Sequence, residues 1–289
     1  MMYIVIPVYN RKKLLNDCLL SLRKQTNRNF TVVVVDDGST DGTDEMLRDE
    51  FPEVVTLRGN GSLWWTGAIN VGVKHALSQC AEEDTLLILN DDLTVPEYYV
   101  ATFFELATRH PDALIGSVVT DIDHPDVIHS GGVRINWLTA KTRDTNLGKS
   151  LASFGKGYFQ EVSTLTGRGV LIPSKVFRKI GVYNDRHYAQ CGDTELPCRA
   201  HRAGYPLIVS YDVPVFSIVR EEGHINHAEK FTVAHIKKYY FNVRSNFNLR
   251  YRFWFAYDAT SNPLQGTVFF VCDFLRITNH FVKRFKVFG

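Results

Sequence analysis

Pairs of acidic residues stand directly behind two apolar segments of this sequence. One pair, Asp36-Asp37, follows four consecutive valines, and the other, Asp91-Asp92, follows Asn90. Adjacent carboxylates repel each other and stay ionised only beside a cation or hydrogen-bond donors. Their oxygens are the ligands that Mg²⁺ and Mn²⁺ prefer, and such an ion joins an acidic site to a phosphate. The pattern therefore predicts a site for a metal-bound nucleotide diphosphate.

Two common phosphate-binding loops are missing from the sequence. The dinucleotide fingerprint GxGxxG does not follow the first apolar segment, and the Walker A pattern GxxxxGK[ST] does not occur. Asp, Asn and Gly also favour turns, which is enough to explain Asp41-Gly42. Turn preference explains less well why two neighbouring segments each end in an acidic pair, so we favour the ligand interpretation.

The elements that must position these acids alternate regularly through the first 119 residues. That order predicts an α/β fold with a Rossmann-like, mostly parallel sheet and helices on both faces. The carboxyl ends of parallel strands border the ligand site of such sheets, so both acidic pairs are expected there. We predict strands at 3–9, 30–35, 54–57, 85–89 and 113–119, and helices at 11–25, 44–49, 68–78 and 96–110.

The second half of the chain is less regular. Short helices are predicted at 173–180 and 193–203, and helical periodicity returns at 228–252. The tail from residue 268 mixes aromatic and basic side chains. Such a helix lies either on an anionic membrane surface or against the domain or a second subunit of a homo-oligomer, and both alternatives stay open. No run of 18 apolar residues occurs, so a transmembrane helix is not expected.

Composition excludes several classes of protein. Thirty-three Lys and Arg against 31 Asp and Glu give a net charge of +2, unlike the strongly basic footprint of nucleic-acid-binding proteins. The five cysteines are odd in number and form no CxxC, which disfavours a disulfide scaffold or a zinc ribbon. We expect a cytoplasmic protein. Residues 1–10 are interpreted as a first strand, not as a signal peptide.

Several ordered segments resemble the family 2 glycosyltransferases of the GT-A fold. The resemblance covers roughly residues 3 to 210, and the spacing around Trp64-Trp65 and Asn90 is similar to that of rhamnosyltransferase-like members. The segments are VIPVYN (5–10), VDDGSTD (35–41), GAINVG (67–72), LNDD (89–92), TGRGV (166–170) and GDTEL (192–196).

The resemblance implies an inverting transfer from a nucleotide-diphospho-sugar, either dTDP-rhamnose or a UDP-sugar, with Mg²⁺ or Mn²⁺. The acceptor would be a hydroxyl of a sugar or lipid-linked saccharide in surface polysaccharide or glycolipid assembly. If the basic tail binds the membrane, the protein would lie at the inner face of the cytoplasmic membrane. Asp193 would be the general base that the acceptor hydroxyl requires, and Asp92 would bind the metal, with His224 as an additional ligand. Gly192 stands where the family has an acid. We therefore do not expect the secondary hydrogen bond that this acid would make, whereas the base itself is unaffected.

The resemblance also implies the binding residues and the domain division. Residues 1–225 would form the GT-A domain, with a nucleotide-binding half (1–119) and an acceptor-binding half (120–225), and residues 226–289 a C-terminal helical extension. The donor or acceptor sugar would contact Trp64, Trp65, Gly167 and Arg168. The nucleotide would contact Pro7, Tyr9, Asn10, Asp36, Asp37, Asn70 and Asp91.

Alternatives remain for single residues and for the whole chain. Asp193 precedes a helical pattern and is also a candidate N-cap, as Asn10 is for the first helix. One of the adjacent residues Trp64 and Trp65 is expected to be packed and the other free to meet a sugar. A sugar nucleotidyltransferase is the enzymatic alternative, although the basic segment after the first strand has no glycine. A sugar-binding module without catalysis is the other alternative.

Overall fold

A computed structural model describes residues 1–218 and 232–285, with side chains to Lys283. The first half forms a parallel sheet around β1 (Met2–Val8), whose neighbours are β2 (Phe30–Asp36) and β4 (Thr85–Ile88). Strand β3 (Val55–Arg58) pairs with β2 at the edge. These strands are continuously apolar because both faces of the sheet are covered.

The second half continues the same sheet through one antiparallel strand. This strand, β11 (Val170–Pro173), lies between β4 and β6 (Leu114–Asp121). Beyond β6 comes the parallel strand β12 (Leu207–Ser217), and β10 (Phe159–Glu161) lies at the edge. The predicted mostly parallel α/β sheet is confirmed. Shorter strands are β5 (Leu93–Thr94), β7 (Ile128–Ser130), β8 (Val133–Ile135) and β9 (Thr142–Asp144).

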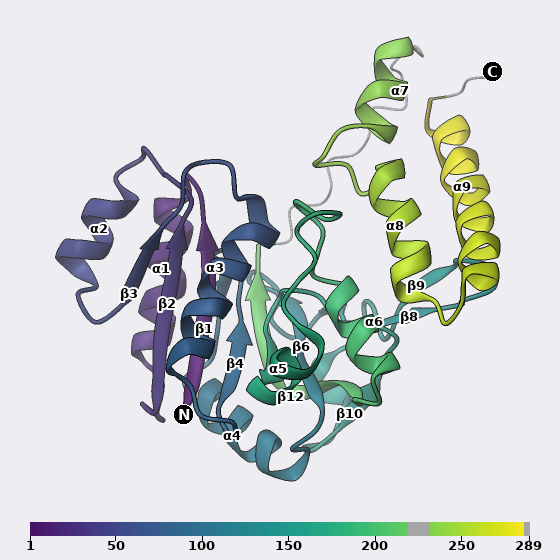
Figure 1. The fold of residues 1–289 in the computed structure, drawn as a ribbon. Coiled ribbons are helices and arrows are strands. Elements are labelled where there is room, and N and C mark those ends of the chain that lie inside the picture. Colours follow the sequence, from purple (N-terminus) through teal and green to yellow (C-terminus); the bar gives the residue numbers. More distant parts are fainter. Residues whose placement is uncertain (219–231, 286–289) are drawn as a thin grey trace.

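Helices cover both faces of the sheet and bury alternate residues of each strand (Figure 1). In β1, Ile4 and Ile6 join one apolar cluster with α1, α2 and α4, whereas Val5 joins another with α3, α5 and α6. This alternation follows from the two-residue period of a strand. The helices are α1 (Lys12–Arg23), α2 (Thr43–Glu50), α3 (Trp64–Gln79), α4 (Tyr99–Arg109), α5 (Ser174–Ile180) and α6 (Glu195–Arg202), with a 3-10 turn at Leu151–Ser153.

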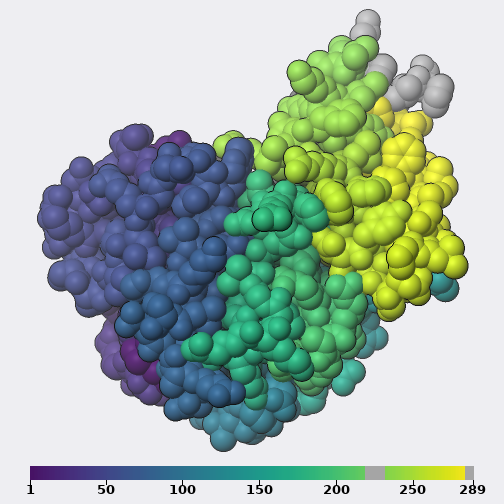
Figure 2. Space-filling view, in the orientation of Figure 1, coloured from purple at the N-terminus to yellow at the C-terminus, as the bar shows by residue number. Residues whose placement is uncertain are grey.

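Three C-terminal helices form a lobe beside the sheet (Figures 1 and 2). They are α7 (Val233–Tyr240), α8 (Leu249–Ala259) and α9 (Pro263–Phe285). Helices α8 and α9 pack together, and α8 also packs on α6. The predicted helical extension is present, with a break between α7 and α8 that periodicity alone did not show. The predicted boundary at residue 225 lies outside the described residues.

Two local predictions are wrong. Asn10 does not cap α1, because Arg11 occupies the N-cap position and no side chain caps the helix. The Asn10 side chain instead accepts the Thr40 N–H at 2.8 Å, and its backbone has a φ of 52°. Asp193 does not cap α6 either, since Thr194 is the N-cap and again makes no side-chain cap. Asn10 and Asp193 each accept a backbone N–H from another segment, from Thr40 and Gly167 respectively.

Candidate functional site

The carboxylate of Asp37, just after β2, holds the loop that leads into α3. Its Oδ1 accepts the N–H of Gly61 at 2.8 Å, and its Oδ2 accepts those of Leu63 and Trp64 at 2.9 and 3.2 Å. Asp37 is only 5% exposed, and hydrogen bonds to backbone donors offset the cost of burying a charge. The side chain therefore fixes the start of α3, and both of its oxygens are in use.

The neighbouring Asp36 has one oxygen in use and one free. Its Oδ1 accepts the N–H of Ser39 at 2.8 Å, whereas its Oδ2 is buried with no hydrogen-bond partner in the described part of the chain. A buried polar atom without a partner costs about 1–3 kcal/mol, which a ligand donor would recover. Of the two acids, Asp36 is thus the one with an oxygen left unpaired among the described residues, although its side chain is 0% exposed.

The second acidic pair, after β4, is bridged by an arginine. Arg11 Nη1 lies 2.8 Å from Asp91 Oδ1 and 3.1 Å from Asp92 Oδ2. Burial raises the pKa of Asp91 to about 6, and the Arg11 charge opposes that rise. Arg11 is absent from the predicted site residues, although a cation three residues after β1 lies at the same edge of the sheet as the acids.

The Asp91-Asp92 pair suits a hard divalent cation. The Asp92 side chain is 32% exposed and the Asp91 side chain 7%, so one carboxylate is open to a ligand. Among the described residues, no group of three or more His, Cys, Asp and Glu comes together. Mg²⁺, however, is commonly held by one or two carboxylates plus substrate phosphates. Asp92, with Asp91 beside it, therefore fits an ion shared with a diphosphate, and His224 lies outside the described residues.

The indole of Trp65 connects the acidic pair to the candidate base. Its Nε1 donates to Asn90 Oδ1 at 2.9 Å. The ring lies against Gly167 so closely that an added Cβ there would overlap it. The Gly167 N–H in turn donates to Asp193 Oδ2 at 3.2 Å. Four residues from α3, the end of β4 and two later loops are thereby brought together.

The surroundings of Asp193 act on its pKa in opposing directions. Burial raises its pKa, while the hydrogen bond from the Gly167 N–H and the charge of Arg168 act in the opposite direction. A carboxylate with a raised pKa binds a proton more strongly, which improves base catalysis as long as it is ionised. Arg168 is itself exposed.

The remaining predicted residues take different places. Tyr9 is 49% exposed, and Trp64 is 39% exposed with the Arg244 guanidinium 5.7 Å from its ring. Pro7 is buried within β1. Asn70 is 2% exposed, and its amide bonds the backbone N–H and C=O of Tyr183. Its side chain therefore ties α3 to the loop before Asp193.

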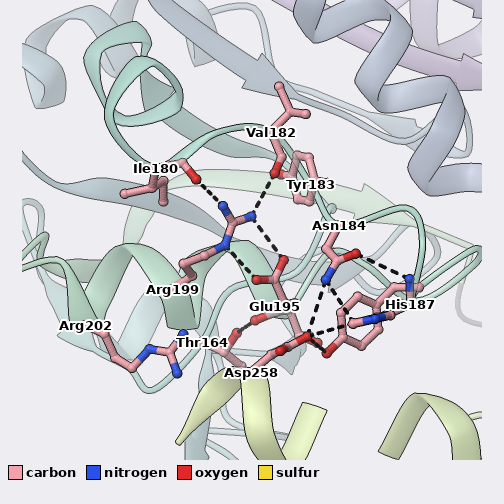
Figure 3. A network of polar contacts seen from close by, with 12 residues as sticks. Thr164, Ile180, Val182, Tyr183, Asn184, His187, Glu195, Arg199, Arg202 and Asp258 are labelled. Atoms are coloured by element: carbon pink, nitrogen blue, oxygen red, sulfur yellow. Dashed lines mark hydrogen bonds and ion pairs between the residues drawn. The ribbon is translucent and has the colours of Figure 1, made fainter. Parts of the chain in front are cut away.

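A buried ion pair fixes the loop that precedes Asp193 (Figure 3). Glu195, which is 1% exposed, binds Arg199 through both oxygens at 2.7 and 3.2 Å. Arg199 also donates to the carbonyl oxygens of Ile180 and Val182. The i,i+4 spacing of the two charged residues on a helical pattern is a sequence signal for this pair. The carbonyl partners follow only from the tertiary structure.

Helix α8 contacts the same loop from the other side. Asp258 accepts the hydroxyl hydrogen of Tyr188 at 2.8 Å and lies 3.3 Å from His187 Nδ1. The hydroxyl groups of Tyr251 and Thr194 are 3.0 Å apart. The segment that carries Asp193 is thus held between the sheet and the C-terminal lobe.

Comparisons with known proteins concern the family and the fold of the chain. The family model "Glycosyl transferase family 2" matches residues 3–164, more than half of the chain. The N-acetylglucosaminyl-diphospho-decaprenol L-rhamnosyltransferase of Mycobacterium tuberculosis is 24% identical over 245 residues, which are 76% of each protein. Glycosyltransferase GlyG of Streptococcus pneumoniae is 29% identical over 120 residues, 39% of this chain and only 38% of GlyG.

Solved structures share the fold at low sequence identity. TarS 1-349 of S. aureus, in complex with UDP-GlcNAc, has a TM-score of 0.61 at 16% identity, over 97% of this chain and 74% of that one. Mannosyltransferase PcManGT from Pyrobaculum calidifontis, in complex with GDP-Man and Mn²⁺, has a TM-score of 0.60 at 17% identity, over 98% and 71%. These similarities support the fold and not a substrate.

Proposed function

Because the chain belongs to glycosyl transferase family 2 and has the GT-A fold, we propose that it transfers a sugar from a nucleotide-diphospho-sugar to an acceptor hydroxyl with inversion. The observation that carries the proposal is the contact chain from Asn90 through Trp65 and Gly167 to Asp193. It joins Asn90, which directly precedes the acidic pair suited to a diphosphate, to a half-buried carboxylate suited to a proton. Family membership disfavours the nucleotidyltransferase alternative.

The proposed reaction is a single displacement. Asp193 takes the proton of the acceptor hydroxyl while the hydroxyl oxygen forms a bond to the anomeric carbon of the donor. The bond from that carbon to the diphosphate oxygen breaks on the opposite face, so the nucleoside diphosphate leaves and the configuration inverts. No covalent sugar-enzyme intermediate forms.

Charge on the departing diphosphate needs compensation. Asp92, with Asp91, would hold the Mg²⁺ or Mn²⁺ that neutralises this charge when bound. Arg11 already contacts both carboxylates, and it keeps the pair compensated while no donor is present. The free Oδ2 of Asp36 would accept a hydrogen bond from the base or ribose.

The donor and acceptor are proposed from the relatives. The M. tuberculosis relative is named as a rhamnosyltransferase acting with a decaprenol-linked sugar, and a TarS structure holds UDP-GlcNAc. We therefore propose dTDP-rhamnose or a UDP-sugar as donor. For the acceptor we propose a lipid-linked saccharide. The exposed Trp64 ring offers a stacking surface for a sugar.

A thermal-shift panel tests the donor site. UDP, dTDP, GDP and CMP are each added with Mn²⁺ or with EDTA. A ligand at about a hundred times its dissociation constant adds roughly 2.7 kcal/mol to folding stability. A Mn²⁺-dependent shift with one diphosphate supports the proposal, and no shift with any of them contradicts it. An Asp193→Asn variant that binds the nucleotide but transfers no sugar separates catalysis from binding, whereas full activity would exclude Asp193 as the base.

A further inference from the structure

Helix α9 is apolar on two opposite faces. One face packs against the rest of the lobe through the apolar Phe269 and Ile277, with Asp273 between them in an ion pair with Arg252. On the opposite face lies a stripe at spacings of four, three and four residues. The stripe consists of Leu264 (76% exposed), Val268 (41%), Val271 (49%) and Leu275 (61%). A helix that is apolar on both faces needs a partner on its open face.

The charge of the C-terminal region indicates which partner this is. Residues 232–289 contain nine Lys and Arg against two Asp, whereas residues 1–231 contain 24 against 29. Both acids are engaged: Asp273 binds Arg252 at 2.8 Å and Arg276 at 2.6 Å, and Asp258 binds the loop before the base. Lys283 is exposed at the end of the helix. Arg252 and Arg276 share the charge of Asp273, and the remaining basic residues give this region its excess of positive charge.

We infer that the stripe of α9 and the basic residues of the lobe dock this protein on an anionic lipid bilayer. An interfacial helix buries its apolar face at the level of the headgroups, and nearby Lys and Arg are attracted to anionic lipids. A second copy is the less suitable occupant, because two lobes with the same large positive charge repel each other. Within the described residues, no helix is both long and apolar enough to cross a bilayer, so contact is with the surface.

The lobe that carries this surface contacts residues of the candidate site. Arg244 lies over the ring of Trp64, and Tyr251 contacts Thr194 beside the base. Figure 1 shows α8 beside α6 and α7 above α8, on the opposite side of the molecule from β1 and β2. Docking would therefore bring a lipid-linked acceptor close to Asp193; this last step alone rests on the proposed function.

Vesicle co-sedimentation of the full chain tests the docking. The vesicles are phosphatidylcholine, with or without about one third phosphatidylglycerol. We expect binding to the anionic vesicles, weakened by salt. The double variant Val271→Ser/Leu275→Ser should bind at least about tenfold more weakly. Lys283→Glu should cost about fivefold or more.

A matched control and two further readouts decide the result. Leu20→Ser, on α1, removes an apolar side chain that is 42% exposed outside the lobe, and it should bind vesicles like the wild type. Equal binding by the stripe variant, or no binding by protein with a native circular dichroism spectrum, would overturn the inference. A dimer in light scattering that the stripe variant abolishes would assign the surface to a second copy and overturn it too. Nucleotide thermal shifts, measured without vesicles, report on the proposed function separately.

Discussion

The substitution Asp→Asn should affect stability at position 37 and ligand binding at position 36. Asp37 accepts three backbone N–H groups from the loop before α3, whereas Asp36 accepts one and keeps a buried oxygen free. Asp→Asn replaces one oxygen by an NH₂ group and removes the charge. At position 37 an essential acceptor is lost, and at position 36 the free acceptor is lost.

The expected loss of stability in Asp37→Asn follows from the number of bonds. If the amide oxygen keeps the Gly61 N–H, the N–H groups of Leu63 and Trp64 face an NH₂ donor. A hydrogen bond to a charged group is worth about 1.5–3 kcal/mol, so two partly buried bonds give a loss of about 3 kcal/mol. At about 2–4 °C per kcal/mol, Tm should fall by about 6–12 °C.

The expected loss in Asp36→Asn concerns the ligand. The amide oxygen still accepts the Ser39 N–H. Because this hydrogen bond is retained, Tm should change by less than about 2 °C. A ligand N–H that meets an NH₂ group in place of an oxygen loses about 1.5–3 kcal/mol. Nucleotide binding should therefore weaken about 10- to 100-fold.

Two measurements on both variants check this reasoning. Thermal unfolding followed by circular dichroism gives Tm, and calorimetric titration with UDP or dTDP in Mn²⁺ gives Kd. The reasoning is refuted if Asp37→Asn keeps the wild-type Tm, or if Asp36→Asn is destabilised as much as Asp37→Asn while its Kd is unchanged.

Three further outcomes are expected. Gly167→Ala should push the Trp65 ring away and lower kcat at least about tenfold with intact nucleotide binding; wild-type kcat would exclude close contact there. The kcat of transfer should fall as pH drops through the pKa of Asp193, which burial places above the ordinary value of 3.8, because the protonated acid accepts no proton; a rate independent of acidic pH would contradict this. Glu195→Gln should lower the free energy of unfolding in urea by about 3 kcal/mol, since Arg199 loses a buried countercharge. Glu53→Gln, at an exposed ion pair, should lower it by under about 1 kcal/mol.

Local pattern was enough for the strands of the first half and for the edge at which the acids gather, but not for β11 and β12, which complete the sheet. The valines before Asp36 and the leucines before Asn90 read as strands because both faces of a covered parallel sheet are apolar. The acids then had to follow at the carboxyl ends. The break between α7 and α8 was missed, although the residues between them include three Asn and one Ser, which favour turns and caps.

The sequence by itself therefore determined the fold class, the order of the elements and the edge at which the acidic residues gather, because these depend on periodicity along the chain. Only the tertiary structure decided which acid is free and which is occupied. The donors to Asp37 come from a loop 24 to 27 residues away, and Arg11 reaches Asp91 across 80 residues. Hydrogen-bond partners at such separations depend on how loops pack at the sheet edge, and no local pattern encodes that packing.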